Sequence, residues 1–199
     1  MFRKTAVEKL GDLAGALMAR GPLHAPVRGA KSVDYEKIQA PAEVTLDFIY
    51  TAMSPKGVFL PQSEELIRYK LGKVTEEEIV PINAEASVLF GVRPWDAKSF
   101  QIMDRHFLGA GIVDPYWKER RDKTTVVGYG LDPTLAPDPA DFFSTLGIHG
   151  SDTEGSDVFM IRKDGTLLFK GVTEKGDRLL EGLAALEAAT AEDEALFEA

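Results

Sequence analysis

The sequence predicts an α/β protein with a mixed sheet, and an α+β arrangement of the same elements is the alternative. Two observations carry this prediction. Short apolar runs of strand length alternate with longer segments whose apolar residues recur at helical spacing, which is typical of an α/β core. Two hairpin signals add antiparallel strands to that core. The 199 residues suffice for one sizeable core, so we expect a single domain over 1–199.

The N-terminal segment is predicted to form a helix within residues 1–20. Its apolar residues share one face, namely Leu10, Leu13, Ala14 and Leu17. Gly21 and Pro22 end this helix, because both residues disfavour its continuation. Residues 23–28 and 32–38 are then expected as the two strands of the first hairpin.

The next segment has a less regular pattern. Residues 46–53 fit either a short helix or an extended stretch, and residues 58–60 fit a short strand. Ser63 is placed to cap a helix, because acidic residues directly after it suit the positive end of a helix dipole. The acidic run 75–78 is expected to be exposed to solvent.

A strand, a turn and a helix follow each other at the centre of the chain. Residues 88–90 are apolar, as in a covered strand, and Gly91 allows the backbone to turn. Pro94 fixes its own φ and biases Arg93 away from helix. Asp96 is expected to cap the helix that follows. That helix has one apolar face, formed by Phe100, Met103 and Phe107.

The second half of the chain repeats the alternation and ends in a helix. Residues 124–127 are expected as a buried strand, and residues 131–155 as a long irregular loop. Asp164 and Gly165 indicate the tight turn of the second hairpin. Residues 177–199 are expected as a leucine-rich C-terminal helix with an acidic tail.

Composition excludes several classes of function. The net charge of −9 repels phosphate backbones, so no nucleic-acid partner is expected. The absence of cysteine removes thiolate nucleophiles, disulfides and cysteine-ligated metals. No apolar run is long enough for a membrane span, and residues 1–20 do not resemble a signal peptide, so a cytoplasmic location is expected. The standard nucleotide-binding fingerprints are also missing.

Three polar residues are candidates for binding a small ligand. Arg93 follows a strand that precedes a helix, where α/β folds tend to build sites, and its guanidinium suits an anion. Arg93 could equally hold the long loop through Asp132, Asp138 or Asp141, and this structural role is the favoured one. Asp96 and His149 are the other candidate ligand-binding residues, and no metal or catalytic set is predicted.

The central stretch resembles a known family. Residues 91–96, 103–108 and 113–117 are similar to the N-terminal part of iron–sulfur electron-transfer subunits, such as those of anaerobic sulfite reductase and the beta subunit of sulfhydrogenase. The resemblance runs from about residue 23 to residue 176. In those proteins it implies four cysteines suited to an iron–sulfur cluster, followed by a C-terminal ferredoxin-like domain with further 4Fe-4S-type clusters.

This sequence departs from the family at each of those features. The positions that match the cysteines carry Trp95, Pro133, Asp141 and Phe143, and the chain stops where the ferredoxin part would begin. Trp95 and Phe143 are bulky enough to occupy the volume of the cluster. The resemblance therefore implies the fold and a redox-complex context, with no cofactor in this chain.

These observations lead to three hypotheses. The first is a cluster-less relative acting as a non-catalytic scaffold or docking subunit of a cytoplasmic redox complex, with iron–sulfur or flavin proteins as partners. The second is a small-molecule binding protein or enzyme that takes an anionic ligand near Arg93, in the vacated cluster pocket. The third is an assembly protein that docks through the apolar face of its C-terminal helix. Whether the chain is itself an enzyme is left open, and a non-catalytic role is favoured.

Overall fold

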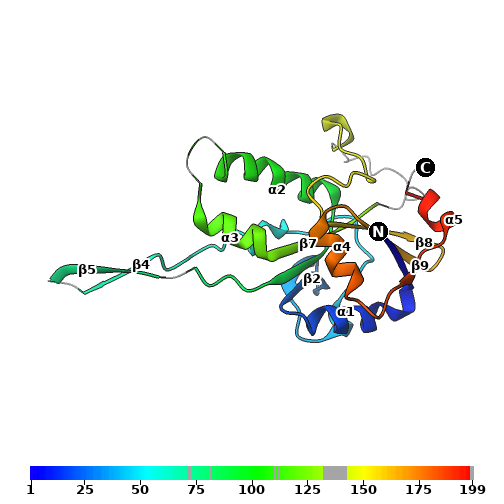
Figure 1. Ribbon diagram of the computed structural model, residues 1–199, viewed down its shortest axis with the longest axis horizontal. Helices are drawn as coiled ribbons and strands as arrows, with labels where there is room; N and C mark the ends of the chain where they lie inside the picture. The colour runs from blue at the N-terminus through cyan, green and yellow to red at the C-terminus, as the bar shows by residue number, and fades with distance from the viewer. Residues whose placement is uncertain (71–72, 81, 110, 112, 132–142, 198–199) are drawn as a thin grey trace.

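The computed structural model describes residues 1–199 except 71–72, 81, 110, 112, 132–142 and 198–199. Within that part of the chain, a mixed sheet of eight strands forms the centre of the molecule, in the order β10-β1-β9-β8-β7-β6-β2-β3. Figure 1 shows helices packed around this sheet. The predicted α/β class with a mixed sheet is confirmed.

Four neighbouring strands at the centre of the sheet are parallel. They are β2 (Leu23–Arg28), β6 (Ser87–Val92), β7 (Thr124–Tyr129) and β8 (Val158–Lys163). Their carboxyl ends meet at one edge of the sheet, where α/β folds place their sites. Antiparallel neighbours complete the sheet, namely β3 (Val33–Lys37) beside β2, and β9 (Thr166–Gly171), β1 (Phe2–Ala6) and β10 (Glu187–Ala188) beyond β8.

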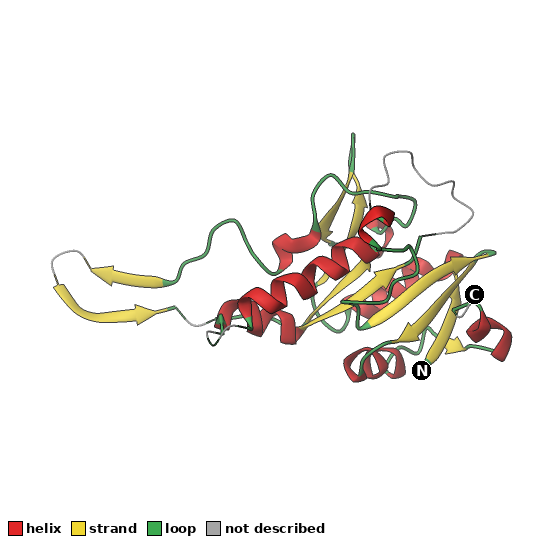
Figure 2. Cartoon of the chain, turned by 90° about the horizontal axis from the view of Figure 1, so that it is seen from above, coloured by secondary structure: helices red, strands yellow, loops and turns green. Residues whose placement is uncertain are grey.

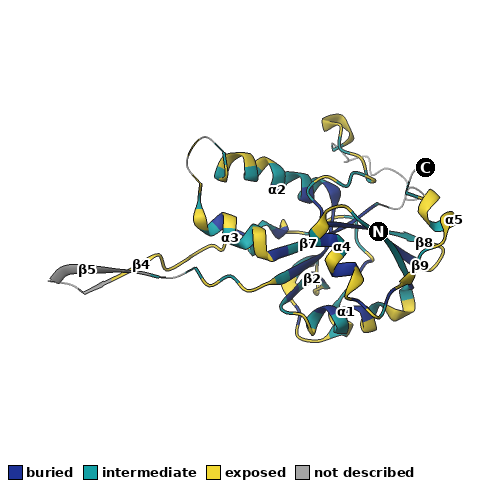
Figure 3. Cartoon of the chain, viewed as in Figure 1, coloured by how far each residue is buried: buried dark blue, intermediate teal, exposed yellow. Residues whose placement is uncertain are grey.

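Helices cover both faces of the sheet and create two hydrophobic cores. On one face α1 (Leu10–Met18) and α4 (Glu174–Glu181) pack on the strands. On the other face α2 (Pro94–Phe107) and α3 (Pro115–Lys123) do so. The predicted apolar face of α2 lies in this second core. Figure 3 shows that burial is concentrated in the strands and in the inward sides of these helices.

The remaining helical elements are short. They are α5 (Ala191–Ala195) and the 3-10 turns η1 (Val7–Lys9), η2 (Pro41–Glu43), η3 (Pro55–Val58) and η4 (Ser144–Leu146). Among the described residues, no helix has the length and apolar character that crossing a bilayer requires.

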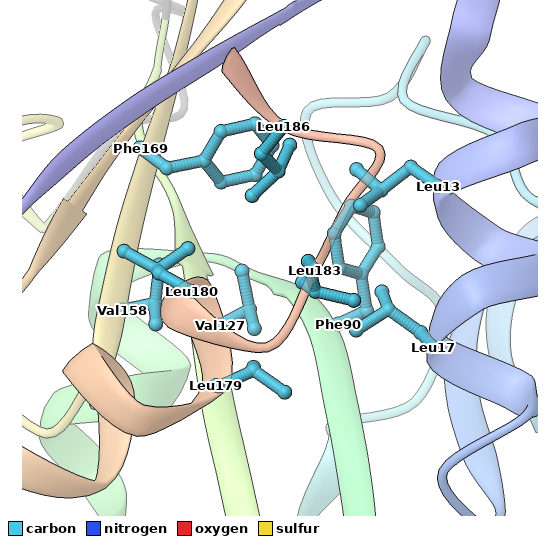
Figure 4. Close-up of a pocket in the computed structure, with 10 residues that line it drawn as sticks. All are labelled: Leu13, Leu17, Phe90, Val127, Val158, Phe169, Leu179, Leu180, Leu183 and Leu186. Atoms are coloured by element: carbon cyan, nitrogen blue, oxygen red, sulfur yellow. The ribbon is translucent and has the colours of Figure 1, made fainter. Parts of the chain in front are cut away.

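The leucines of the C-terminal region are part of the first core. Leu179, Leu180, Leu183 and Leu186 face α1 and the sheet around an apolar cavity of about 10 Å³ (Figure 4). A cavity this small and this apolar has no polar partner for a water molecule. The hypothesis that this leucine face docks a partner is therefore wrong, because the sheet and α1 already cover it.

Both ends of the chain differ from the predicted helices. The sequence predicts one helix within residues 1–20, but Phe2–Ala6 form β1 and the helix begins only at Leu10. The strand forms because β9 offers a free edge, to which β1 pairs along its whole length. The helix predicted from residue 177 starts at Glu174 and ends at Glu181, and the chain then returns as β10 to cover the outer edge of β1.

A two-stranded arm projects from the body. The helix expected after Ser63 is absent, and β4 (Ile67–Lys70) pairs instead with β5 (Lys73–Ile79), which contains the acidic run 75–78. Both strands contain β-branched or aromatic residues, which favour extended structure. Figures 1 and 2 both show the arm extending away from the large sheet. Two smaller expectations also change: residues 46–53 are irregular, and η3 overlaps the strand expected over 58–60.

Gly91 is an extra residue inside β6 and not a turn after it. Phe90 pairs with Val127 and Val92 pairs with Gly128, so Gly91 has no partner of its own in β7 and β6 contains one extra residue at this point. Gly91 has a φ of 77°, as in a glycine β-bulge. The extra residue reverses the alternation of side chains beyond it. The first core therefore receives Phe90, the second receives Val92, and Arg93 returns to the first face.

We predict that Gly91→Ala destabilises the protein by roughly 1–3 kcal/mol. The positive φ strains any L side chain, and an added Cβ would lie 3.1 Å from Cγ of Pro26. Gly57→Ala is the matched control, because a Cβ there meets no atom within 4 Å. Urea unfolding of the two variants measures the difference, and equal midpoints would show that the bulge is not constrained.

Candidate functional site

Arg93 is buried at the carboxyl edge of β6 and β7, with 2% of its surface exposed. Its Nη1 donates to the carbonyl oxygens of Tyr129 (3.2 Å) and Gly130 (2.8 Å). Its Nη2 donates to the carbonyl oxygen of Phe48. One guanidinium thereby connects the start of α2, the end of β7 and the irregular segment 46–53.

Two aromatic rings enclose the guanidinium. Its carbon lies 4.5 Å from the centre of the Phe48 ring and 4.3 Å from that of Tyr129. These cation–π contacts and the carbonyl dipoles offset part of the cost of burying a charge. Burial nevertheless lowers the pKa of Arg93. Its partners among the described residues are carbonyls and rings, whereas the carboxylates expected at positions 132, 138 and 141 lie outside the described residues.

Asp96 does not cap α2, contrary to the sequence prediction. The helix begins at Pro94, so the capping position belongs to Arg93 and Asp96 is the third helical residue. The Asp96 Oδ1 accepts a hydrogen bond of 2.7 Å from the Ser54 hydroxyl. Burial raises the pKa of Asp96, and the bond from Ser54 and the charge of Lys56 offset only part of this effect. Asp96 thus ties the segment before η3 to the first turn of α2.

His149 lies in the irregular segment after η4. It is exposed, and its backbone N–H donates to the Asp152 carboxylate at 2.9 Å. Among the described residues, no hydrogen bond or ion pair joins its imidazole to Arg93 or Asp96. The described residues also contain no group of three His, Asp or Glu side chains placed to hold a metal ion. The described hydrogen bonds connect Arg93 and Asp96 to other residues than the one that binds the backbone of His149.

Two of the four predicted cluster positions are in direct contact. The rings of Trp95 and Phe143 stack with centres 4.6 Å apart and planes 10° from parallel. Tyr50 packs against both, at 5.4 Å from Trp95 and 6.3 Å from Phe143. Trp95 and Phe143 are half-buried and Tyr50 is 38% exposed, so this aromatic cluster reaches the surface. Pro133 and Asp141 lie outside the described residues.

Two further arginines at this edge were not predicted from the sequence. Arg28, the last residue of β2, donates to the backbone oxygen of Asp47. Arg162, near the end of β8, forms an ion pair of 2.8 Å with the Asp47 carboxylate. The only sequence signal for them was that both stand at the ends of strands that prove to be parallel. Asp47 lies in a segment whose structure the pattern left undecided.

Over 194 residues, or 96% of this chain, the sequence is 27% identical to sulfhydrogenase 2 subunit beta of Pyrococcus furiosus. The chain is similar to a sulfhydrogenase beta subunit. The resemblance predicted from residues 91–117 is thereby confirmed, and it extends over nearly the whole chain.

The similarity to the sulfhydrogenase protein covers only part of that relative. The matched region is 55% of its length, so this chain spans about half of the relative that it matches. No protein-family model matches the chain. No solved structure matches it either.

We predict that Arg93→Met destabilises the protein by about 3–5 kcal/mol, because two buried carbonyls and one half-buried carbonyl would lose their donor. Arg93→Lys should recover only part of this loss, since an ammonium cannot reproduce the planar fork. Arg105→Met, on the exposed side of α2, is the matched control and should change stability by less than about 0.5 kcal/mol. Chemical denaturation separates the variants; wild-type stability for Arg93→Met would contradict the structural role.

We predict that Asp96 makes the protein less stable as pH rises. Because its folded-state pKa is raised, the folded protein holds the proton at pH values where the unfolded chain has lost it. The stabilising contribution of Asp96 is therefore fully present below the pKa that it has in the unfolded chain. This contribution is lost as the pH rises through the pKa that Asp96 has in the folded protein. Asp96→Asn should gain stability relative to wild type as the pH rises above about 4, the ordinary pKa of an aspartate. Urea titrations across this range would contradict the prediction if the difference were constant.

Proposed function

We propose that this chain is a cluster-less, non-catalytic scaffold or docking subunit of a redox complex of the hydrogenase or reductase type. Its similarity to a sulfhydrogenase beta subunit over 96% of its length supports the context of such a complex. The partners would be the subunits that carry iron–sulfur clusters or flavin. The fold alone does not specify this role, so the proposal depends on the residues at the carboxyl edge.

The stacked pair of Trp95 and Phe143 is the observation that carries the proposal. Both stand where the family resemblance implies cluster cysteines, and each presents a hydrocarbon ring in place of a thiolate. Cluster iron is held by cysteine thiolates, which this sequence does not contain. A stack at 4.6 Å leaves no room for a cluster between the rings. These residues do not fit an iron–sulfur cluster, and they support a packing role for this volume.

The same aromatic cluster is a suitable contact for another protein of the complex. Aromatic side chains are enriched at protein interfaces because they bury a large area at low entropic cost. Trp95 and Phe143 are half-buried and Tyr50 is more exposed, so a partner can cover them without unfolding the edge. The irregular segment that carries Tyr50 is held in place by Arg93.

The test is anaerobic purification of the tagged chain from its native host, with mass spectrometry and an iron count on each separated chain. We expect iron–sulfur or flavin proteins to accompany the wild type in a fixed ratio. We expect no iron on this chain itself. Trp95→Ala should reduce the recovery of those partners, whereas Leu146→Ala should not, because Leu146 is an exposed apolar residue outside the aromatic cluster.

A cysteine-restored variant tests whether the substituted positions mark a former cluster site. It carries Trp95→Cys, Pro133→Cys, Asp141→Cys and Phe143→Cys. After anaerobic reconstitution with iron and sulfide, we expect this variant to hold iron and the wild type to hold none. Iron bound stoichiometrically by the wild type would overturn the cluster-less role. A wild-type chain purified without redox proteins would overturn the docking role.

A further inference from the structure

Three arginines converge on one short segment at the carboxyl edge of the sheet. Arg28 ends β2, Arg93 follows β6 and Arg162 lies near the end of β8. All three bind residues Asp47 and Phe48: Arg28 the Asp47 carbonyl, Arg93 the Phe48 carbonyl, and Arg162 the Asp47 carboxylate. Because the four central strands are parallel, these side chains come from one edge.

Among the described residues, two of these three arginines have no carboxylate partner. Arg28 and Arg93 bind neutral carbonyl oxygens, and the carboxylate of Asp47 balances only Arg162. Tyr129 lies near two of the arginines: its ring centre is 4.3 Å from the Arg93 guanidinium carbon, and, while burial raises the pKa of its phenol, the charge of Arg162 acts to lower it. Planar guanidinium groups that have no carboxylate partner in the described part of the chain suit a carboxylate or a phosphate.

The ion pair that now occupies Arg162 is weak enough for a ligand to replace it. The Asp47 side chain is 77% exposed and that of Arg162 is 38% exposed, so their ion pair faces water and contributes little to stability. A competing anion can therefore displace the Asp47 carboxylate at small cost.

We propose that this edge binds a small oxyanion, a carboxylate or a phosphate group. In the absence of ligand, the Asp47 carboxylate occupies the position on Arg162 that the ligand would take. Arg162 and Arg28 contact the anion directly. Arg93 is a positioning residue, because it acts through the Phe48 carbonyl and the Tyr129 ring. The site differs from the predicted set of Arg93, Asp96 and His149, since only Arg93 belongs to both. It is independent of the proposed docking role.

Binding is measured by isothermal titration with inorganic phosphate and with succinate, each at constant ionic strength. Asp47→Asn removes the competing carboxylate and should tighten binding by roughly two- to fivefold. Arg162→Gln should weaken binding by about tenfold or more. Lys31→Gln is the matched control, because Lys31 is an exposed cation in the β2–β3 turn, at the same end of β2 but outside the arginine cluster. All three substituted residues are at the surface, so the variants are expected to fold.

The relative affinities for the two anions identify the class of ligand, and two other results would overturn the proposal. Stronger binding of phosphate assigns a phosphorylated ligand, whereas stronger binding of succinate assigns an organic acid. The proposal is overturned if neither anion binds. It is also overturned if Arg162→Gln and Lys31→Gln weaken binding equally, since that result describes general screening of charge. Because the purified chain alone is titrated, failure here leaves the co-purification result unaffected.

Discussion

The burial of one guanidinium organises the carboxyl edge of this protein. Arg93 holds three backbone carbonyls from two separate segments, and two aromatic rings enclose its charge. That arrangement requires Arg93 to face the first core, which it does only because the Gly91 bulge shifts the alternation of β6 by one residue. The Tyr35 hydroxyl donates to the Gly91 carbonyl at 2.9 Å and so fixes the bulge from β3.

The elements that could be predicted from the sequence are those whose signals are local. The strand and helix around Pro94 and the hairpin at Asp164 and Gly165 are present, and Asp164 has the positive φ that such a turn requires. The elements that were missed depend on distant partners. Phe2–Ala6 become a strand because β9 offers an edge, and residues after Glu181 leave the helix because β10 pairs with β1. Residue spacing carries no information about such pairing.

In the candidate site, too, the features with a local sequence signal could be predicted and those that depend on distant residues could not. The position of Arg93 at a strand end was predictable, because a glycine and a proline surround it in an apolar context. Its carbonyl partners were not, since they come from residues 48, 129 and 130. The contacts of Asp47 with Arg28 and Arg162 join positions far apart in the chain, and they exist only once β2 and β8 are parallel. The contact between Trp95 and Phe143 was expected only through the family resemblance.

The β4–β5 arm has a consequence for handling this protein. In the described part of the chain, neither of its strands pairs with a strand of the large sheet. The chain enters the arm through the loop before β4, drawn in green in Figure 2. A fluorophore or an affinity handle attached there would sit far from both cores and from the arginine and aromatic groups. The arm is therefore the natural place to anchor the molecule to a surface while leaving its carboxyl edge free to be probed.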